Sequence, residues 1–220
     1  MKLITAILFF LTFSTLANDN VNMFSLLKKR DPINDFWSWF AKNQEKFYNL
    51  SNENQEKLFD ELSLQLNKIG NDVTFEFSPI LENKTRELVI SADGIKSSFP
   101  IVQEIIKKAP SLPNWKFIAF RQRHSELLTV QFGSAKISKN DIYFKFAKDN
   151  VKIAIQLHIR NYIDNNDFGS AKFIFLDQVL GEYDVEMKLS VIECVKLSDN
   201  DIANLMAISE LPKVVDTYCK

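Results

Sequence analysis

Two arginines are the residues of this sequence best suited to bind a ligand. Arg121 and Arg123 alternate with Gln122 and His124 directly after an apolar segment. In an extended chain both guanidinium groups would lie on one side, and each presents a planar fork of donors that suits a carboxylate or a phosphate. With Asp93 orienting one arginine, the residues predict a site for a small anionic ligand. The alternative is a structural Asp–Arg ion pair that ties down the edge of a sheet.

A second polar string follows Gly181. If a strand already begins at Glu182, then Glu182, Asp184 and Glu186 share one face, where they would hold a hard cation such as Ca²⁺ or simply face solvent. Glu182 and Asp184 also give, together with His124, the weak catalytic candidates for a hydrolase or a metal-assisted enzyme. The catalytic residues are otherwise unknown from the sequence.

Familiar catalytic and cofactor motifs are missing from the sequence. Residues 164–169 resemble the start of an EF-hand loop, but Phe168 and Phe175 occupy positions that need oxygen ligands. Two histidines and two cysteines do not give a zinc-binding spacing. There is no nucleophile elbow, phosphate loop or dinucleotide fingerprint. We therefore expect no metal and no cofactor, and the leading hypothesis is a non-enzymatic protein that binds a small anionic ligand or an unknown protein.

The elements that would position the arginines form a βαβ unit. Residues 87–92 and 115–120 are strand-like, and residues 98–109 between them read as a helix. Such a crossover makes the two strands parallel, so both end at the same edge of the sheet. Ligands gather at the carboxyl ends of parallel strands. Asp93 is therefore predicted to lie near Arg121 and Arg123.

The remaining pattern predicts an α+β fold. Apolar residues at helical spacing indicate an N-terminal helical hairpin over residues 33–50 and 52–69, packed on a mixed, mainly antiparallel sheet with the one βαβ crossover. Residues 173–180 are ambiguous between helix and strand. Further strands are expected at 73–78, 127–132, 141–146, 151–159 and 185–191, and helices at 199–208 and 211–218.

The N-terminus has the three parts of a secretory signal peptide. Lys2 precedes the uncharged apolar residues 3–16, and small residues stand before a cleavage site expected after about Ala17. The run is short for a membrane anchor, so we expect a secreted or periplasmic protein with no stable membrane span after cleavage. The expected organisation is a signal peptide (1–17), a linker (18–32) and one globular domain (33–220).

The charge balance, the two cysteines and one tryptophan bear on what the protein could bind and how it is stabilised. With 27 basic and 28 acidic residues the chain lacks the basic excess of a nucleic-acid-binding protein. In an oxidising compartment Cys194 and Cys219 would form a disulfide if their Cα atoms lie within about 7 Å; otherwise they are two free thiols. Trp39 is expected to point away from the core face of its helix, which leaves open a protein-interaction surface there.

Four segments together resemble the signature of an uncharacterised bacterial domain family. They are FWSWF (36–40), VISADG (89–94), APSLPNWKFIAFRQR (109–123) and LGEYDVE (180–186). The resemblance covers most of the chain after the signal peptide and implies that residues 33–218 form one domain. It implies no activity and brings no catalytic residues.

Overall fold

The computed structural model describes residues 30–124, 126 and 129–219. The chain divides into a segment up to Asp31 and a compact unit, Pro32–Lys220, and only the second is described here. The expected signal peptide, its cleavage site and nearly all of the expected linker lie outside the described residues.

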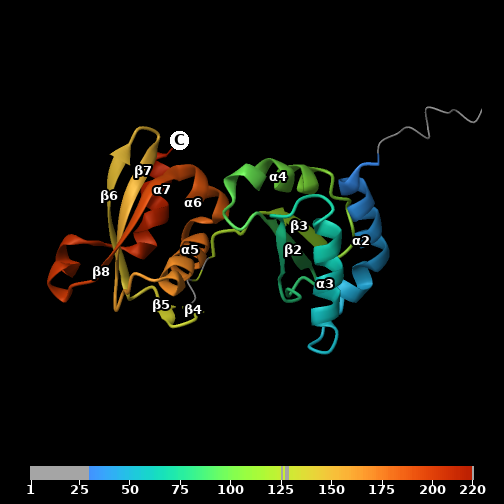
Figure 1. The fold of residues 1–220 in the computed structure, drawn as a ribbon, viewed down its shortest axis with the longest axis horizontal. Helices are drawn as coiled ribbons and strands as arrows, with labels where there is room; N and C mark the ends of the chain where they lie inside the picture. The colour runs from blue at the N-terminus through green and yellow to red at the C-terminus, as the bar shows by residue number, and fades with distance from the viewer. Residues whose placement is uncertain (1–29, 125, 127–128, 220) are drawn as a thin grey trace, which may run out of the picture. The chain divides into compact units, whose positions relative to one another are not determined.

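The first part of the compact unit is a three-stranded sheet covered by helices. Helices α2 and α3 lie side by side next to this sheet, as expected for the hairpin (Figure 1). Trp37 of α2 donates from Nε1 to the carbonyl of Ile105 in α4, so α4 lies on the same face. The elements are α2 (Pro32–Tyr48), α3 (Gln55–Leu66), β1 (Thr74–Phe77), β2 (Arg86–Ser91), α4 (Phe99–Lys107) and β3 (Trp115–Ala119).

The expected βαβ crossover is present. Strand β2 pairs in parallel with β3, with Leu88 opposite Phe117, and antiparallel with β1. Leu88 is buried and Phe117 packs against the rings of Trp37 and Phe40, while the alternate residues Glu87 and Lys116 form an ion pair. This alternation turns one face of the sheet toward the helices, and Glu87 and Lys116 lie on the opposite face together with Val89 and Ile118.

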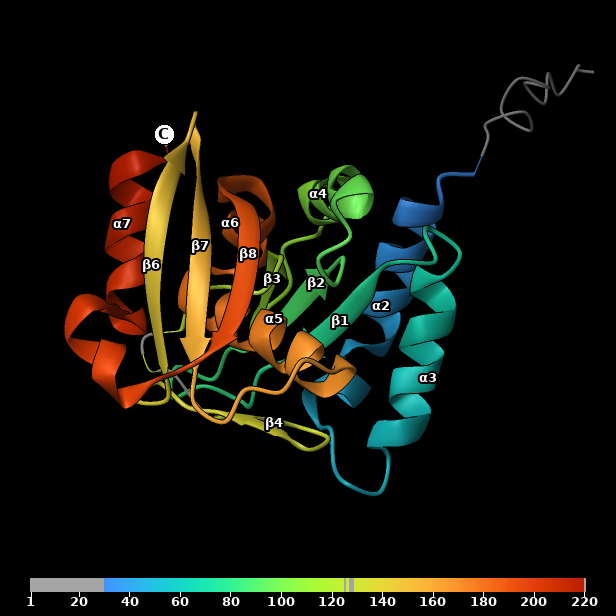
Figure 2. The ribbon, with the colours of Figure 1, turned by 60° about the vertical axis from the view of Figure 1, so that its left-hand side comes forward.

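The second part is built on a four-stranded sheet in the order β8-β7-β6-β9 (Figure 2). Strands β7 and β8 are parallel and are joined through two helices, so a second βαβ crossover exists that the sequence did not predict. A short hairpin, β4–β5, precedes this sheet. The elements are β4 (Val130–Phe132), β5 (Ala135–Ile137), β6 (Ile142–Asp149), β7 (Lys152–Ile159), α5 (Asn166–Leu180), α6 (Glu182–Lys188), β8 (Leu189–Lys196), β9 (Met206–Ala207) and α7 (Leu211–Tyr218).

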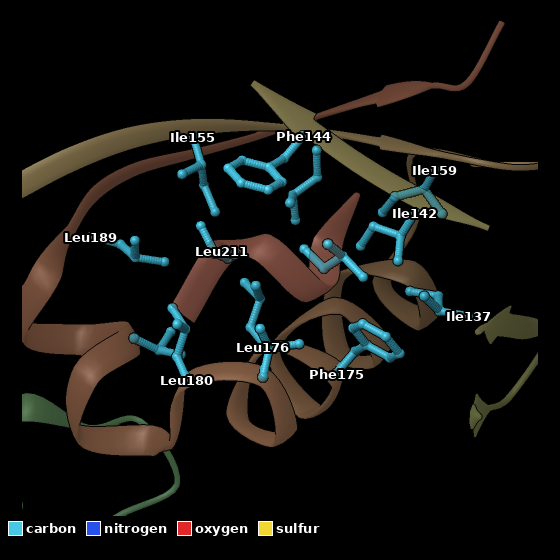
Figure 3. Packing of buried hydrophobic residues seen from close by; sticks show 14 of the residues in the cluster. Ile137, Ile142, Phe144, Ile155, Ile159, Phe175, Leu176, Leu180, Leu189 and Leu211 are labelled. Atoms are coloured by element: carbon cyan, nitrogen blue, oxygen red, sulfur yellow. The ribbon is translucent and has the colours of Figure 1, made fainter. Parts of the chain in front are cut away.

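A second apolar core fills the space between this sheet and its helices. Figure 3 shows Phe144 and Ile155 of the sheet facing Leu176 and Leu180 of α5 and Leu211 of α7. Completely buried side chains of this size stabilise a fold by roughly 1.5–3 kcal/mol each. Together with the first core they confirm the α+β class, with mixed and mainly antiparallel strands distributed over separate sheets.

The segment after Gly181 differs from its prediction. Residues 185–191 were expected to form a half-buried strand, but α6 spans Glu182–Lys188 and β8 begins only at Leu189. Val185 and Leu189 are four residues apart, a spacing that fits either element, and acidic residues in the first turn favour the helix. The face shared by Glu182, Asp184 and Glu186 therefore does not exist, because alternate residues of a helix point in different directions.

The structure also decides three smaller expectations. The helix expected at 199–208 is instead a 3₁₀ helix, Asp199–Asn204, followed by the short strand β9. The ambiguous residues 173–180 are the second half of α5, whose N-cap Asn165 accepts from the backbone N–H of Phe168. Trp39 is half-buried, with its ring 5.6 Å from that of Phe47, so it does not stand free of the core. His158 is buried, yet neither of its ring nitrogens has a hydrogen-bond partner among the described residues. Within these residues, no helix has the length and apolar character needed to cross a membrane.

Candidate functional site

The site lies where the parallel strands β2 and β3 end. Ser91 is the last residue of β2, and the chain then turns through Asp93 and Gly94 with φ values of 51° and 77°. After β3, Phe120 also has a positive φ, 66°, which is unusual for a bulky side chain. These turns aim backbone N–H groups at the space beyond the strand ends.

The carboxyl group of Glu182 occupies that space. Its Oε2 accepts from the hydroxyl of Ser91 at 2.7 Å and from the N–H of Arg121 at 3.2 Å. Its Oε1 accepts from the N–H groups of Ala92 at 3.0 Å and Gly94 at 3.1 Å. Four donors to two oxygens is the pattern of an ionised carboxylate, and it offsets the cost of burying this completely inaccessible side chain. The anion expected at this sheet edge is thus supplied by the chain itself.

A close backbone contact seats Glu182. The N–H of Glu182 donates to the carbonyl of Arg121 at 3.0 Å, so the two segments bond in both directions. Gly181, directly before it, has φ +82°, and a Cβ there would lie 3.2 Å from the same Arg121 carbonyl oxygen. Only glycine adopts this conformation without strain and permits so close an approach.

The guanidinium of Arg121 is shared among three carboxylates. Its Nε donates to Glu76, and its Nη1 lies 2.9 Å from Asp93 Oδ1 and 3.3 Å from Asp177 Oδ2. Burial opposes the charge of Arg121, but its bonds to Glu76 and Asp93 outweigh this effect and raise its pKa. The predicted proximity of Asp93 and Arg121 is therefore found as an ion pair.

Arg123 belongs to a separate group of charges. It forms a bidentate pair with Asp216 of α7, at 2.8 and 2.9 Å, and also contacts Asp184. Its Nε donates to the carbonyl of Leu180 at 2.8 Å. These bonds, that to Asp216 first, raise the pKa of Arg123. Both arginines thus bind carboxylates of the protein, an arrangement that matches the structural alternative drawn from the sequence.

The weak catalytic candidates do not form an acid–base arrangement. The two carboxylate oxygens of Glu182 accept hydrogen bonds from four donors, and Asp184 pairs with Arg123 and Lys188. His124 is exposed, and its backbone N–H donates to the carbonyl of Gln178. Within the residues that the structure describes, no three side chains of histidine, cysteine, aspartate or glutamate are placed to hold a metal ion.

Beside the strand ends lies an open pocket of about 440 Å³. Its polar wall carries three carboxyl groups and one guanidinium, from Asp93, Arg121, Asp177 and Glu186. One face of α5 supplies Ser170, Phe173 and Ile174, because residues three or four apart on a helix point the same way. Gly94, after β2, and Phe132, the last residue of β4, complete the lining.

The environment of the pocket disfavours charge on two of its carboxyl groups, those of Asp177 and Glu186. Burial raises the pKa of Asp177 to about 7, although the guanidinium of Arg121 acts in the opposite direction. Burial likewise raises the pKa of Glu186, against the charges of Lys152 and Lys96. Partly desolvated, charge-crowded carboxyl groups in a cavity are a common property of binding and catalytic sites.

Sequence reasoning missed Ser91, Asp177 and the apolar lining of the pocket. Ser91 is the last residue of β2 and the last residue but one of the strand predicted at 87–92, where its hydroxyl could have been recognised as a donor near the sheet edge. Asp177 was missed because residues 173–180 were ambiguous between helix and strand. Phe132 and Phe173 resembled core residues in the sequence, and only the structure shows that they are exposed.

The two cysteines are free in the structure. Cys219 is buried and its Sγ lies 3.6 Å from the carbonyl oxygen of Lys188, whereas Cys194 is half-buried in β8. Burial raises the pKa of both thiols, so neither has the low pKa of a reactive cysteine.

Comparison with known proteins finds no match: no protein-family model fits the sequence, and no curated protein and no solved structure is significantly similar. The resemblance to an uncharacterised bacterial domain family therefore stays a prediction from the four sequence segments.

Proposed function

We propose that this is an exported, non-enzymatic binding protein whose ligand occupies the pocket beside the strand ends. The observation that carries the proposal is the lining of this pocket, where charged groups converge next to exposed aromatic rings. Phe132 and Phe173 are the two exposed phenylalanines among the described residues, at 43% and 41% of their full accessible surface. Exposed rings around a concave polar site are typical of ligand binding.

The anchoring of Glu182 supports a binding role over the catalytic role predicted for this residue, because both of its carboxylate oxygens already accept hydrogen bonds. Ion pairs and this buried carboxylate also hold the strand ends beside the pocket in place, which favours a pre-formed site and lowers the cost of binding. Export is supported by the signal-peptide pattern of residues 1–17. The N-terminal sequence of the secreted protein tests it: we expect Asn18, and an intact Met1 would contradict export.

A blocking substitution tests the binding proposal. Ser170 lies on the pocket face of α5, so Ser170→Trp should fill the cavity. Leu64→Trp is the matched control, because Leu64 is exposed on α3 and does not line the pocket. In a thermal-shift screen of small molecules, ligands should protect the wild-type and control proteins and fail to protect Ser170→Trp, and mass spectrometry should recover them unchanged. Equal protection of all three proteins would contradict the proposal.

The second candidate is an acid–base enzyme that uses Asp177 and Glu186. The observation in its favour is the raised pKa of both carboxyl groups, since a general acid or base works best when its pKa lies near the working pH. Chemical conversion of a pocket ligand, lost in Asp177→Asn, would establish this function in place of simple binding.

A further inference from the structure

We infer that the pocket takes a small organic cation, an ammonium or guanidinium group carried on an apolar body. The inference rests on the proposed function and adds the chemical class of the ligand. It reverses the expectation of an anionic ligand.

The charged residues that line the pocket favour a cation. Three acidic side chains, Asp93, Asp177 and Glu186, face the pocket with one basic side chain, Arg121. The guanidinium of Arg121 is divided between two of these acids and Glu76, which lies outside the lining. Lys96 and Lys152, which lie outside the lining, partly offset the charge of Glu186. Arg121 alone cannot neutralise Asp93, Asp177 and Glu76 together. The carboxylate of Asp93 is also accessible, with 70% of its side-chain surface exposed. A cation that enters the pocket therefore meets carboxylate charge that the protein's own cations do not fully neutralise.

The hydrogen-bond donors at the strand ends disfavour an anion, because they are already occupied. An anion would seek the guanidinium of Arg121 or the backbone N–H groups beside it. The guanidinium is already shared among three carboxylates, and the N–H groups of Ala92, Gly94 and Arg121 already donate to Glu182. Displacing this buried carboxylate would leave its charge without compensation, which is costly. The hydrogen-bond donors of the site are therefore bound by Glu182, whereas the carboxylate acceptors of the pocket remain open to a ligand.

The apolar residues of the lining favour a ligand with an apolar body. Phe132, Phe173 and Ile174 are each about two-fifths exposed and line the same pocket. Aromatic faces attract cations. The volume of about 440 Å³ is in the range of pockets for small molecules. An amine with an aromatic or aliphatic body fits both halves of the lining.

The test compares three probes of similar size at pH 8: 2-phenylethylammonium, 2-phenylethanol and 3-phenylpropionate. Binding is measured from chemical-shift changes of the protein in two-dimensional NMR spectra. We expect the ammonium to bind at least about tenfold more tightly than the carboxylate and to lose its shifts in Ser170→Trp. Because a peptide could present the same group, N-acetyl-Phe-Lys amide is a fourth probe, and tighter binding of this peptide would overturn the small-molecule assignment.

Charge-neutralising variants make the test specific. Asp93→Asn should weaken binding of the ammonium about threefold to tenfold and keep the fold, since asparagine tolerates the positive φ at this position. Glu186→Gln should act in the same direction. Glu56→Gln, at an exposed position of α3 outside the lining, is the control.

Two outcomes separate the inference from the proposed function. Preferred binding of the alcohol or the carboxylate, lost in Ser170→Trp, would overturn the cation and leave the pocket as a binding site. If no probe causes chemical-shift changes that disappear in Ser170→Trp, both the cationic ligand and the proposed binding site would be overturned.

Discussion

The hydroxyl of Ser91 donates to the carboxylate of Glu182 at 2.7 Å, across 91 positions of the chain and between two side chains with no accessible surface. This bond joins the end of β2 to the start of α6. The same helix contributes Val185 to one apolar core and packs Met187 against the other. The Glu182 anchor is therefore the point at which the strand ends, the two cores and the pocket are fixed together.

Replacing Glu182 with glutamine should destabilise the fold by about 3 kcal/mol, because a buried amide places two donors against groups that are themselves donors. Urea unfolding measures the change. The control Glu56→Gln, at an exposed position of α3, should change the free energy of unfolding by less than about 0.5 kcal/mol. Equal stability of the two variants would show that Glu182 is not an anchor.

Gly181→Ala should destabilise by about 1–3 kcal/mol, because φ +82° is strained for alanine and the new Cβ would crowd the Arg121 carbonyl oxygen. Gly169→Ala is the matched control within α5. No atom lies within 4 Å of a Cβ at Gly169, and its φ is unexceptional, so alanine should be neutral or should stabilise by up to about 1 kcal/mol. Thermal unfolding of both variants measures the difference, and a loss at Gly169 as large as that at Gly181 would contradict the argument.

Asp177 should make the protein less stable as pH rises. Its pKa is raised from an ordinary value of 3.8 to about 7, so between about pH 4 and 7 the folded state keeps a proton that the unfolded state has lost. The free energy of unfolding then falls with increasing pH across this window. In Asp177→Asn this contribution disappears, and the variant should gain stability relative to the wild type as pH rises from 4 to 7.

The comparison of the two proteins is needed because His158 acts in the opposite direction. Burial lowers the pKa of His158, with Lys145 adding to the effect, so this residue favours folding at higher pH. It contributes equally to both unfolding profiles and cancels in their difference. A difference that shrinks with rising pH would contradict the assignment to Asp177.

Both cysteines should titrate as thiols. In denaturant without reductant, a thiol reagent should modify Cys194 and Cys219. In the native protein at pH 8 both should react slowly, since burial raises the pKa of each thiol. An intact mass with no modification after denaturation would instead reveal the disulfide that the sequence left open.

Local patterns predicted much of the fold and part of the site. The apolar spacing of Phe36 and Phe40 placed α2 correctly, and the order of strand, helix and strand predicted that Asp93 and Arg121 would meet. What failed was the segment after Gly181, because Val185 and Leu189 fit a helix as well as a strand. The identity of the anion at the sheet edge depended on this segment, which lies about 60 positions from Arg121. Such a contact leaves no local pattern.

The exposed rings of the pocket were beyond sequence reasoning for a related reason. Phe132 and Phe173 belong to a chain with 19 phenylalanines, most of which fill the two cores. Residue type cannot separate these two from the others. Their exposure follows from how β4 and α5 are placed beside the strand ends.

Glu182 acts as the protein's own anion at the strand ends, and rescue of Glu182→Ala by acetate is the sharpest test of this role. This variant leaves a cradle of three backbone N–H groups and one hydroxyl that a free carboxylate can enter. The account predicts that acetate raises the melting temperature of Glu182→Ala in a saturable manner, relative to chloride at equal ionic strength, and leaves the wild type unchanged. Equal effects of acetate on both proteins, or a Glu182→Ala variant as stable as the wild type without acetate, would contradict it.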